Sequence, residues 1–455
     1  MTPRHDMQGN ILRGYASHRH AAYLLTRVGD PAQARAFMRR LLKDDQIATE
    51  RSWRARPVMR LNVAFTHPGL KRLHPNVDAF APFTDFRQGM RERARSQLGD
   101  VGANDPHQWE SRLREEIDAL FTVYGDTVGA RDDAARDLTR ELRAATFTLV
   151  HDQRADMLEG DREHFGFTDG FSQPALPGVS EDRRSRRGEG AQRRRWRRLL
   201  GDEWRDIRLG EFVLGHRDED GVVPGGREPL LYNGTFMVWR KLEQDVKLFR
   251  QWIQMQAGDA EEAQIRLQAR ILGRWPDGVS LVRRPPFDAS YRATGSPSAI
   301  HNPDINDFTY RADRLGLRCP LGAHVRRCNP RDALGFRTER ARRNRIIRRG
   351  MPYVDAGHAP SRGLIFVCFN ASITRQFEQI QGHWLMGGDS FGLGSDRDFL
   401  TAGVDAEQPA VKMTLQGTRD RPPQFLTRDR QFVTVRGGHY LFVPGLSALR
   451  QIVGG

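Results

Sequence analysis

Three side chains with the chemistry of an active site lie far apart in this chain. Asp169 is an acid that can take up or release a proton, His324 has a side chain that can bind a metal, and Arg348 is a permanent cation. Glycine, proline or aromatic residues lie near each of them, which is typical of turns and close packing. A site that uses all three requires a fold that brings them together.

Asp169 lies in a short segment bracketed by glycines, residues 166–170. An Asp-Gly pair readily forms a tight turn, so a turn is the ordinary interpretation. The aromatic neighbours Phe165 and Phe171 indicate that this turn is buried. A buried carboxylate needs an ion-pair partner or a role in proton transfer, and the sequence alone leaves the turn and the site open as alternatives.

His324 is a single histidine without the neighbours of a zinc site. The chain has no H-E-x-x-H segment and no C-x-x-C pair, so the ordinary interpretation is a histidine of the core or the surface. One histidine can nevertheless hold iron when a porphyrin supplies the other four ligands. Composition and periodicity do not show a porphyrin.

Arg348 follows the apolar pair Ile346-Ile347 and precedes residues 350–353, Gly-Met-Pro-Tyr. In a chain so rich in arginine, most arginines are solvated or form surface ion pairs. Its position between an apolar pair and a predicted turn indicates that Arg348 lies in a site. There it would be a fixed positive charge.

Ser390 offers a competing interpretation as the nucleophile of a hydrolase. Residues 388–392, GDSFG, fit the G-x-S-x-G pattern, which needs a strand before the serine and a helix after it. The preceding residues instead favour a helix and the following ones a loop. We therefore interpret this segment as glycine-rich coil.

The charge balance is strongly basic. The 455 residues include 72 Lys and Arg against 57 Asp and Glu, a net charge of +15. The densest block, Arg183–Arg198, is predicted to be a solvated loop with weak polyanion binding at most, and a nucleic-acid-binding protein is the alternative. Three cysteines, no apolar stretch of membrane-spanning length and no secretory leader favour a cytoplasmic protein without disulfides or membrane contact.

The two halves of the chain show a similar order of elements. In the first half, Asp30-Pro31 predicts the start of a helix, and a helical insertion at 83–98 and 105–113 separates two strand-helix-strand units. This order predicts an α+β fold of two ferredoxin-like domains, each an antiparallel sheet with helices packed on it, at residues 1–205 and 206–455. Strands are predicted at 21–28, 58–66, 117–124, 146–151, 233–242 and 363–370, helices at 132–144, 243–256 and 374–384, a loop-rich region at 257–320, and a hairpin at 431–435 and 439–443.

Longer motifs surround the three chemical residues and continue along nearly the whole chain. They are GFTDGFSQP at 166–174, CP at 319–320 with AHVR at 323–326 and NPR at 329–331, IRRGMPY at 347–353, DMQGNILRG at 6–14, GEFVLG at 210–215, NGTF at 233–236, RQFE at 375–378 and GG at 437–438. Together they resemble the dye-decolourising peroxidase family of heme enzymes. The chain departs from the family's pattern at His216-Arg217, Val354 and Arg183–Arg198. None of these positions is one of the three chemical residues, so the departures bear on substrate access more than on heme binding.

The resemblance implies two ferredoxin-like domains with a heme pocket in the second and a single heme b in each chain. His324 is implied as the proximal iron ligand, with Asp396 or Asp398 as candidate acceptors for its second ring nitrogen. Asp169 is implied as the distal acid-base and Arg348 as the charge that stabilises the departing oxygen. Arg331 is similar to the arginine that pairs with a heme propionate. The remaining cofactor-binding residues that the motif implies are Gly166, Phe167, Thr168 and Gly170.

The implied function is a peroxidase that reduces hydrogen peroxide and oxidises dyes or phenolic compounds in one-electron steps. An aspartate base implies an acidic activity optimum, since its ordinary pKa is near 3.9. Bulky donors would require electron transfer through surface aromatic residues, with Trp196, Trp239 and Trp384 as candidates. A heme carrier or iron-release protein without turnover is the alternative within heme proteins. A homo-oligomer is compatible with either function.

Overall fold

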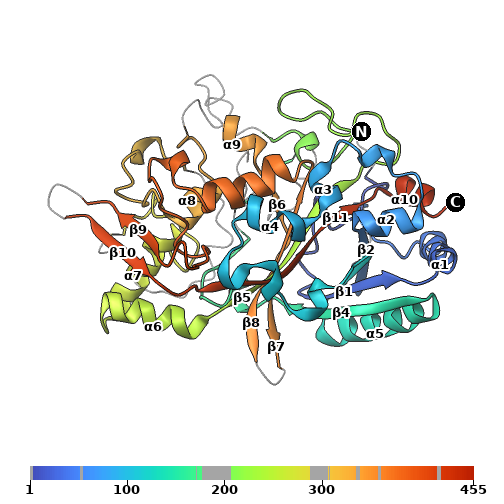
Figure 1. Cartoon of the computed structure of the whole chain (residues 1–455), viewed down its shortest axis with the longest axis horizontal. Coiled ribbons are helices and arrows are strands. Elements are labelled where there is room, and N and C mark those ends of the chain that lie inside the picture. The colour runs from blue at the N-terminus through green and yellow to red at the C-terminus, as the bar shows by residue number, and fades with distance from the viewer. Residues whose placement is uncertain are drawn as a thin grey trace.

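The computed structural model describes residues 4–51, 55–170, 172–176, 206–286, 306, 308–334, 339–356, 360–417 and 422–454. The domain boundary predicted at residue 205 and the Arg183–Arg198 block lie outside these ranges, so both stay predictions. Within these ranges, no helix has the length and apolar character needed to cross a membrane. Figure 1 shows two halves side by side. One half contains α1 (Pro31–Lys43), α2 (His67–Leu73) and α5 (Val128–Ala144), and the other contains α6 (Val246–Ala257), α7 (Glu261–Leu272) and α8 (His324–Cys328).

The first half forms an antiparallel sheet with the strand order of a ferredoxin-like fold, β4-β1-β3-β2. Each predicted strand and helix of the two strand-helix-strand units is present. Their bounds are β1 (His20–Val28), α1 (Pro31–Lys43), β2 (Met59–Phe65), β3 (Ala119–Gly125), α5 (Val128–Ala144) and β4 (Phe147–Asp156).

Local sequence explains how α1 begins and which face it buries. The side chain of Asp30 accepts hydrogen bonds from the backbone nitrogens of Ala32 (2.7 Å) and Gln33 (3.3 Å). This cap satisfies amide groups that the first turn of a helix leaves unpaired. Phe37 and Met38 are buried against the sheet, as the helical spacing predicts.

The helices in the insertion between β2 and β3 are shorter than predicted. Gly89, in the left-handed region with φ of 78°, divides the expected helix 83–98 in two. The expected helix at 105–113 is wrong, since two 3₁₀ turns at Pro106–Gln108 and Ser111–Arg114 occupy this region. The helices of the insertion are α2 (His67–Leu73), α3 (Thr84–Gln88) and α4 (Met90–Leu98).

The second half repeats the same strand order as β11-β5-β8, followed by β6, while β7 also pairs with β8. Strands β9 and β10 form a separate two-stranded sheet. The elements are β5 (Thr235–Gln244), α6 (Val246–Ala257), α7 (Glu261–Leu272), α8 (His324–Cys328), α9 (Glu339–Arg343), β6 (Ile347–Arg348), β7 (Met351–Asp355), β8 (Ser361–Asn370), a π-helix (Thr374–Leu385), β9 (Val411–Leu415), β10 (Gln424–Arg428), β11 (Val433–Val443) and α10 (Leu446–Ile452).

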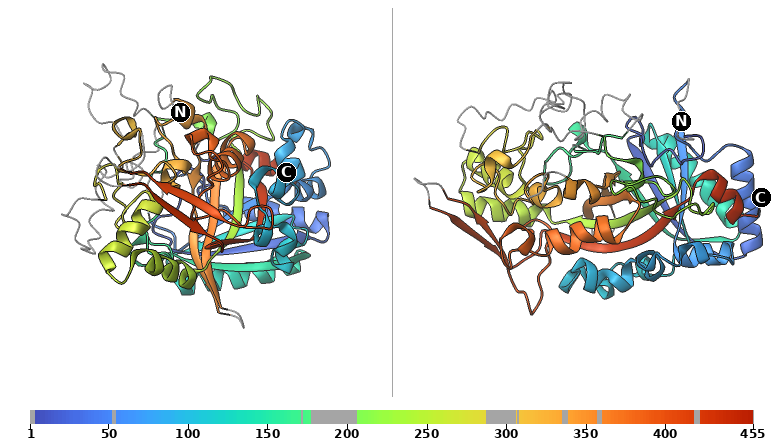
Figure 2. Two further views of the ribbon diagram at one scale, coloured as in Figure 1. Left: turned by 60° about the vertical axis from the view of Figure 1, so that its left-hand side comes forward. Right: turned by 90° about the horizontal axis from the view of Figure 1, so that it is seen from above.

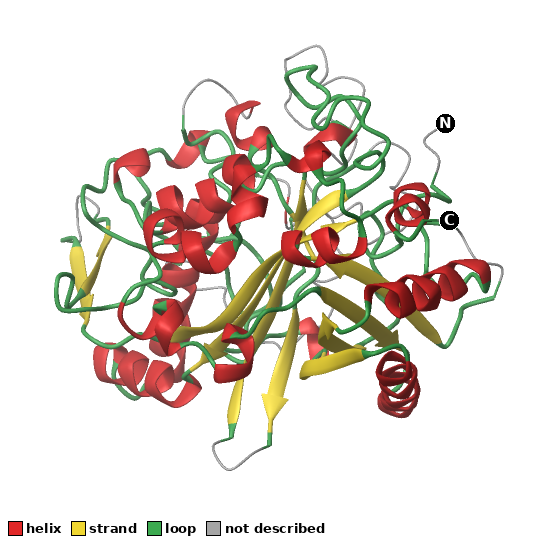
Figure 3. Ribbon diagram, turned by 45° about the vertical axis from the view of Figure 1, so that its right-hand side comes forward, coloured by secondary structure: helices red, strands yellow, loops and turns green. Residues whose placement is uncertain are grey.

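The two sheets join edge to edge into one nine-stranded sheet. Strand β2 pairs with β11 where Phe65 lies opposite Phe442. Strands β4 and β7 come into contact, and Gln153 donates a hydrogen bond to Asp355 over 3.0 Å. The curved sheet thus encloses an apolar core that includes Trp239, and helices cover its outside (Figures 2 and 3). The predicted fold class is confirmed.

Two predictions about the second half are wrong. The expected terminal hairpin is a single strand, β11, whose register against β5 shifts between Val435 and Gly437. A Cβ atom on Gly437 would lie 2.5 Å from Leu113, so close approach of a neighbouring segment explains this glycine better than a turn. The region predicted as loop-rich contains α7, whose buried Leu267 and Ile271 are spaced one turn apart.

Candidate active site

A cavity of about 280 Å³ lies on the outer face of the second sheet. Along β5, Trp239 points into the enclosed core while Leu242 lines the cavity, as alternation along a strand requires. The three residues predicted to carry the chemistry, Asp169, His324 and Arg348, all line this cavity. The fold therefore brings together residues that the sequence separates by up to 179 positions.

His324 is the first residue of the short helix α8, and a buried carboxylate fixes its ring. Its Nδ1 lies 3.1 Å from Oδ2 of Asp398, whose other oxygen accepts hydrogen bonds from the backbone nitrogen (2.8 Å) and hydroxyl (2.7 Å) of Thr401. Burial opposes ionisation of Asp398, but His324 and the hydrogen bonds outweigh it and hold its pKa at about 2. An ionised carboxylate only accepts hydrogen bonds, so Nδ1 carries the proton and Nε2 is the nitrogen left to hold a metal.

The structure decides between the two candidate partners of His324. Asp398 is the partner, while Asp396 contributes its backbone carbonyl to Arg327 (2.8 Å). Cys328, one turn further along α8, places its sulfur 3.5 Å from Nε2 of His324. No motif in the sequence indicates a role for this thiol. Its position four residues after His324, one helical turn, is the signal that predicts the contact between the two side chains.

Asp169 and Arg348 form an ion pair within the cavity wall. Nη1 of Arg348 donates to Oδ1 of Asp169 over 2.8 Å. Burial acts to raise the pKa of Asp169, but the charge of Arg348 and the hydrogen bonds from Arg348 and the Gly170 amide outweigh it, so this pKa is lowered. The carboxylate is therefore ionised, and the pKa of Arg348 is raised chiefly by the charge of Asp169.

Side chains and backbone around this pair hold it in place. The side chain of Gln173 makes two hydrogen bonds to the backbone of Arg348. Its Oε1 accepts from the Arg348 nitrogen (3.1 Å), and its Nε2 donates to the Arg348 carbonyl (3.0 Å). The amide of Gly170 donates to Oδ1 of Asp169 over 2.7 Å. Thr168 donates from its backbone nitrogen and its hydroxyl to the carbonyl of Pro276, each over 3.1 Å.

The predicted segment 166–170 thus ties the two halves of the chain together. Gly166 and Gly170 adopt φ values of 102° and 90°, which only glycine adopts readily. Phe167 and Thr168 line the cavity. The turn is present, and Asp169 within it is half-buried, with 36% of its side chain exposed and Arg348 as its ion-pair partner.

Buried arginines gather near the cavity. Arg274 lines it, and Oδ1 of Asn306 accepts hydrogen bonds from both Arg274 and Arg331, each over 2.7 Å. Arg331 also donates to the carbonyls of Asn306 and Phe308 and lies over the Phe308 ring, 3.7 Å from its centre. Burial, followed by the charges of Arg331 and Arg348, lowers the pKa of Arg274 to about 10.

Arg331 itself is absent from the described lining of the cavity, whereas Arg274 and Arg345 belong to it. The propionate role predicted for Arg331 stays a prediction. No motif in the sequence distinguishes Arg274 or Arg345 from the many other arginines of the chain. Their importance depends on tertiary packing alone.

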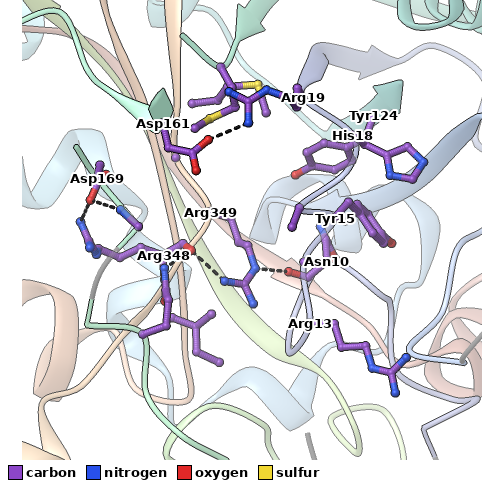
Figure 4. A pocket seen from close by; sticks show the side chains of 18 of the residues that line it. Asn10, Arg13, Tyr15, His18, Arg19, Tyr124, Asp161, Asp169, Arg348 and Arg349 are labelled. Carbon is purple, nitrogen blue, oxygen red and sulfur yellow. Dashed lines mark hydrogen bonds and ion pairs between the residues drawn. The ribbon is translucent and has the colours of Figure 1, made fainter. Parts of the chain in front are cut away.

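A second cavity, of about 220 Å³, lies on the other side of the ion pair (Figure 4). Four residues line both cavities, so the Asp169–Arg348 pair lies in the wall between them. Figure 4 shows Arg349 between Arg348 and Asn10, with Tyr15 and Tyr124 across from Asp169. The shared residues are Glu163, Asp169, Arg348 and Leu364.

The donor set of the first cavity fits a heme better than a bare metal ion. Across the described part of the chain, no group of three or more His, Cys, Asp or Glu side chains could hold a metal by protein ligands alone. The cavity instead offers one fixed histidine, apolar walls that include Leu242 and Phe366, and nearby guanidinium groups. These match an iron porphyrin, which brings its own four nitrogen ligands and two carboxylates.

Two other sequence interpretations are now resolved. Ser390 lies in a 3₁₀ turn, Asp389–Phe391, after the π-helix, so the strand that a nucleophile elbow needs is missing at this position. Trp239 is 0% exposed and Trp384 is 4% exposed, so the prediction that they are surface residues is wrong. Trp196 lies outside the described residues.

The comparisons with known proteins agree with this geometry. Residues 6–156 match a family model described as the DyP dimeric alpha+beta barrel domain, and residues 215–390 match one described as Dyp-type peroxidase, C-terminal. The chain belongs to the dye-decolourising peroxidase family. It is therefore a peroxidase of a heme-dependent family.

Relatives and solved structures of this family match the chain over nearly its full length. Multifunctional dye peroxidase DyP2 of Amycolatopsis sp. is 28% identical, covering 98% of this chain and 95% of the relative. An ancestral D-type dye decolorizing peroxidase is 26% identical with a TM-score of 0.77, covering 99% of both chains. A dye-decolorizing peroxidase solved in complex with 2,6-dimethoxyphenol is 23% identical with a TM-score of 0.78, covers 100% of both chains, and shares the fold.

Proposed function

We propose that this chain binds a single heme b and uses hydrogen peroxide to oxidise phenolic or dye-like donors one electron at a time. The observation that carries the proposal is the Asp169–Arg348 ion pair in the wall of the cavity that His324 lines. An acid-base, a fixed cation and a metal ligand in one cavity are the groups that peroxide cleavage at heme iron requires.

His324 would hold the heme iron through Nε2. Its Nδ1–H donates to the ionised Asp398, which makes the imidazole a more electron-rich ligand. Arg274, Arg331 and Arg345 are the candidates to hold the propionates, because guanidinium groups bind carboxylates through paired hydrogen bonds. Bound heme supplies the redox centre, and the protein supplies position and charge.

Asp169 would move the peroxide proton. Both hydrogen bonds that it receives from Arg348 and Gly170 end on Oδ1, and no described residue donates to Oδ2. Oδ2 is thus the oxygen that can take the proton from one peroxide oxygen and return it to the departing one. A lowered pKa keeps the carboxylate in the basic form in mild acid.

Arg348 would stabilise the negative charge that develops on the departing oxygen. Its guanidinium is permanently charged, and Gln173 and Asp169 fix its backbone and side chain. A preorganised cation of this kind needs no rearrangement during the reaction. Neither Arg348 nor Asp169 has to move far, because they are already in contact.

The test is a stopped-flow experiment on heme-loaded protein with hydrogen peroxide, followed by turnover with 2,6-dimethoxyphenol. We expect rapid spectral change on peroxide addition and steady oxidation of the phenol. A heme carrier would show a Soret band without turnover. Heme-loaded protein that leaves both peroxide and phenol unchanged would refute the proposal.

A further inference from the structure

Glu163 is an acid in the wall between the two cavities, and the proposed reaction does not use it. It lines both cavities, as Asp169 and Arg348 do. The second cavity reaches the protein surface, since the exposed residues Arg162 and Gly170 also line it. A carboxyl group at this position can exchange protons with the solvent on one side and with the first cavity on the other.

Hydrogen bonds hold the carboxylate of Glu163, but no cation balances its charge. Its Oε1 accepts from the backbone nitrogen of Phe167 (2.9 Å), and its Oε2 accepts from that of Phe165 (2.8 Å). Nε2 of Gln244 on β5 also donates to Oε2 over 2.6 Å. Among the residues that the structure describes, no arginine, lysine or histidine forms an ion pair with Glu163. Glu163 can thus gain a proton without breaking an ion pair, whereas Asp169 cannot.

Gln244 is a partner that suits both the ionised and the protonated form of Glu163. It is 8% exposed and lines the first cavity, and its Oε1 has no hydrogen-bond partner within the described part of the chain. Ionised Glu163 accepts from Nε2, whereas protonated Glu163 is a donor and needs an acceptor. Half a turn of the amide exchanges Nε2 for Oε1, so Gln244 can bond to either form. A lysine or arginine in its place could serve only the ionised form.

Other charged groups line the two cavities around Glu163. Besides Asp169 and Arg348, the charged groups and histidines of the first cavity are Asp100, Arg240, Arg274, His324 and Arg345. Those of the second cavity are Arg13, His18, Arg19, Asp161, Arg162 and Arg349. Tyr15 and Tyr124 also line the second cavity, but burial raises the pKa of both, so they stay neutral. Of all these charges, that of Asp169 acts most strongly on Glu163.

The surroundings of Glu163 and Asp169 move their pKa values in opposite directions. Burial raises the pKa of Glu163 against its hydrogen bonds, and the negative charge of Asp169 adds to this rise. For Asp169, the charge and hydrogen bond of Arg348 outweigh burial and lower the pKa. In mild acid, Glu163 can therefore hold a proton while Asp169 is ionised, which is the usual arrangement of an acid beside a base.

The proposed reaction needs more protons than Asp169 can supply. Reduction of hydrogen peroxide to two waters takes up two electrons and two protons. Asp169 would move a proton from one peroxide oxygen to the other, which provides neither of these two. A donor that gives up only electrons leaves both protons to come from the solvent, so they need a route into the first cavity.

We propose that Glu163 carries protons from the second cavity into the first, where peroxide is reduced. Protonated Glu163 releases its proton toward the first cavity and takes up another from the second, so the side chain is unchanged after each cycle. As a claim about turnover, the inference rests on the proposed peroxidase function. The protonation of Glu163 in mild acid does not depend on turnover.

The test uses heme-loaded enzyme with ferrocyanide as the donor, because ferrocyanide gives up one electron and no proton. Stopped flow separates the reaction with peroxide, which requires Asp169, from the later oxidation of ferrocyanide, which takes up protons. Glu163→Gln keeps the size of the side chain but cannot release a proton. Glu163→Asp is the conservative control, since it keeps the acid.

We expect Glu163→Gln to slow ferrocyanide oxidation about 10²-fold while its reaction with peroxide stays within about threefold of wild type. In wild type, ferrocyanide oxidation should slow as the pH rises through the raised pKa of Glu163, because only the protonated form delivers a proton. This dependence on pH should be absent in Glu163→Gln and present in Glu163→Asp. An equal slowing of both reactions in Glu163→Gln, or a pH profile like that of wild type, would overturn the inference.

Infrared spectra of the heme-loaded proteins without peroxide provide a second readout. The difference spectrum between wild type and Glu163→Gln should contain the band of a protonated carboxylic acid in mild acid, and this band should disappear as the pH rises. Absence of the band would overturn the inference whatever the rates are. Wild type that reacts with peroxide but fails these tests contradicts the inference alone. Wild type that shows the band but leaves peroxide unchanged contradicts the proposed peroxidase function.

Discussion

Replacing Asp398 by asparagine should loosen the heme through its effect on His324. The aspartate accepts three hydrogen bonds, two from Thr401 on Oδ1 and one from His324 on Oδ2. Asparagine has one acceptor oxygen and one donor nitrogen. Whichever way the amide turns, one of these contacts becomes donor against donor, and the negative charge behind the imidazole is lost.

The magnitude follows from what the carboxylate does in this site. Asp398 is fully buried, and a hydrogen bond between a charged acceptor and its donor contributes about 1.5–3 kcal/mol. Loss of such a partner behind a metal-binding histidine lowers metal affinity about 10–100-fold. We therefore expect Asp398→Asn to bind heme 10–100-fold more weakly than wild type.

The assay is titration of apoprotein with hemin, followed at the Soret band, with the reduction potential of the loaded protein as a second readout. Asp396→Asn is the matched control, because Asp396 lies two residues away and its side chain has no contact with His324. A less electron-rich imidazole should also raise the iron potential. Affinity within about twofold of wild type and an unchanged potential in Asp398→Asn would show that the carboxylate does not support His324 as a ligand.

Three further predictions follow from the site and its supports. Asp169→Asn should slow the peroxide reaction about 10²–10⁴-fold in stopped flow while leaving hemin affinity unchanged; an unchanged rate would exclude Asp169 as the base. The lowered pKa of Asp169 keeps its carboxylate ionised in acid, so the rate of the peroxide reaction should fall only as the pH drops through that pKa. Arg348→Leu should move this fall to higher pH and slow the reaction about 10²–10³-fold. A pH profile that does not shift in Arg348→Leu would contradict the role of the ion pair. Glu378→Ala should cost about 3–5 kcal/mol in the free energy of unfolding, measured by denaturant titration, because it leaves the partly buried Arg93 and the buried Tyr440 without their shared partner; a loss below about 1 kcal/mol would contradict this.

Local signals predicted the fold well wherever the determinants lie close together in the sequence. Asp30 and Pro31 mark the start of α1 because capping involves only neighbouring residues. Gly437 misled the prediction because its determinant is Leu113, more than 300 positions earlier. A glycine required for close approach and a glycine required for a turn look the same in sequence.

The site was accessible to sequence reasoning mainly through the resemblance. Asp169, His324 and Arg348 come from separate segments, and no periodicity predicts that they line one cavity. Asp398 was one of two candidates, and only the packing of α8 distinguished it from Asp396. The roles of the buried arginines depend on contacts between distant residues, which cannot be read from a single sequence. The thiol of Cys328 lies four residues after His324, so helical spacing alone could have indicated that contact.

The most direct test of the account is the absorption spectrum of His324→Ala after hemin titration. Since the sulfur of Cys328 lies 3.5 Å from Nε2 of His324, the same measurement on His324→Ala with Cys328→Ala excludes replacement by the thiol. We expect the double variant to lack the Soret band of histidine-bound heme, and Cys328→Ala alone to retain it. A double variant that keeps the wild-type spectrum and heme content would contradict the assignment of His324 as the ligand that organises this site.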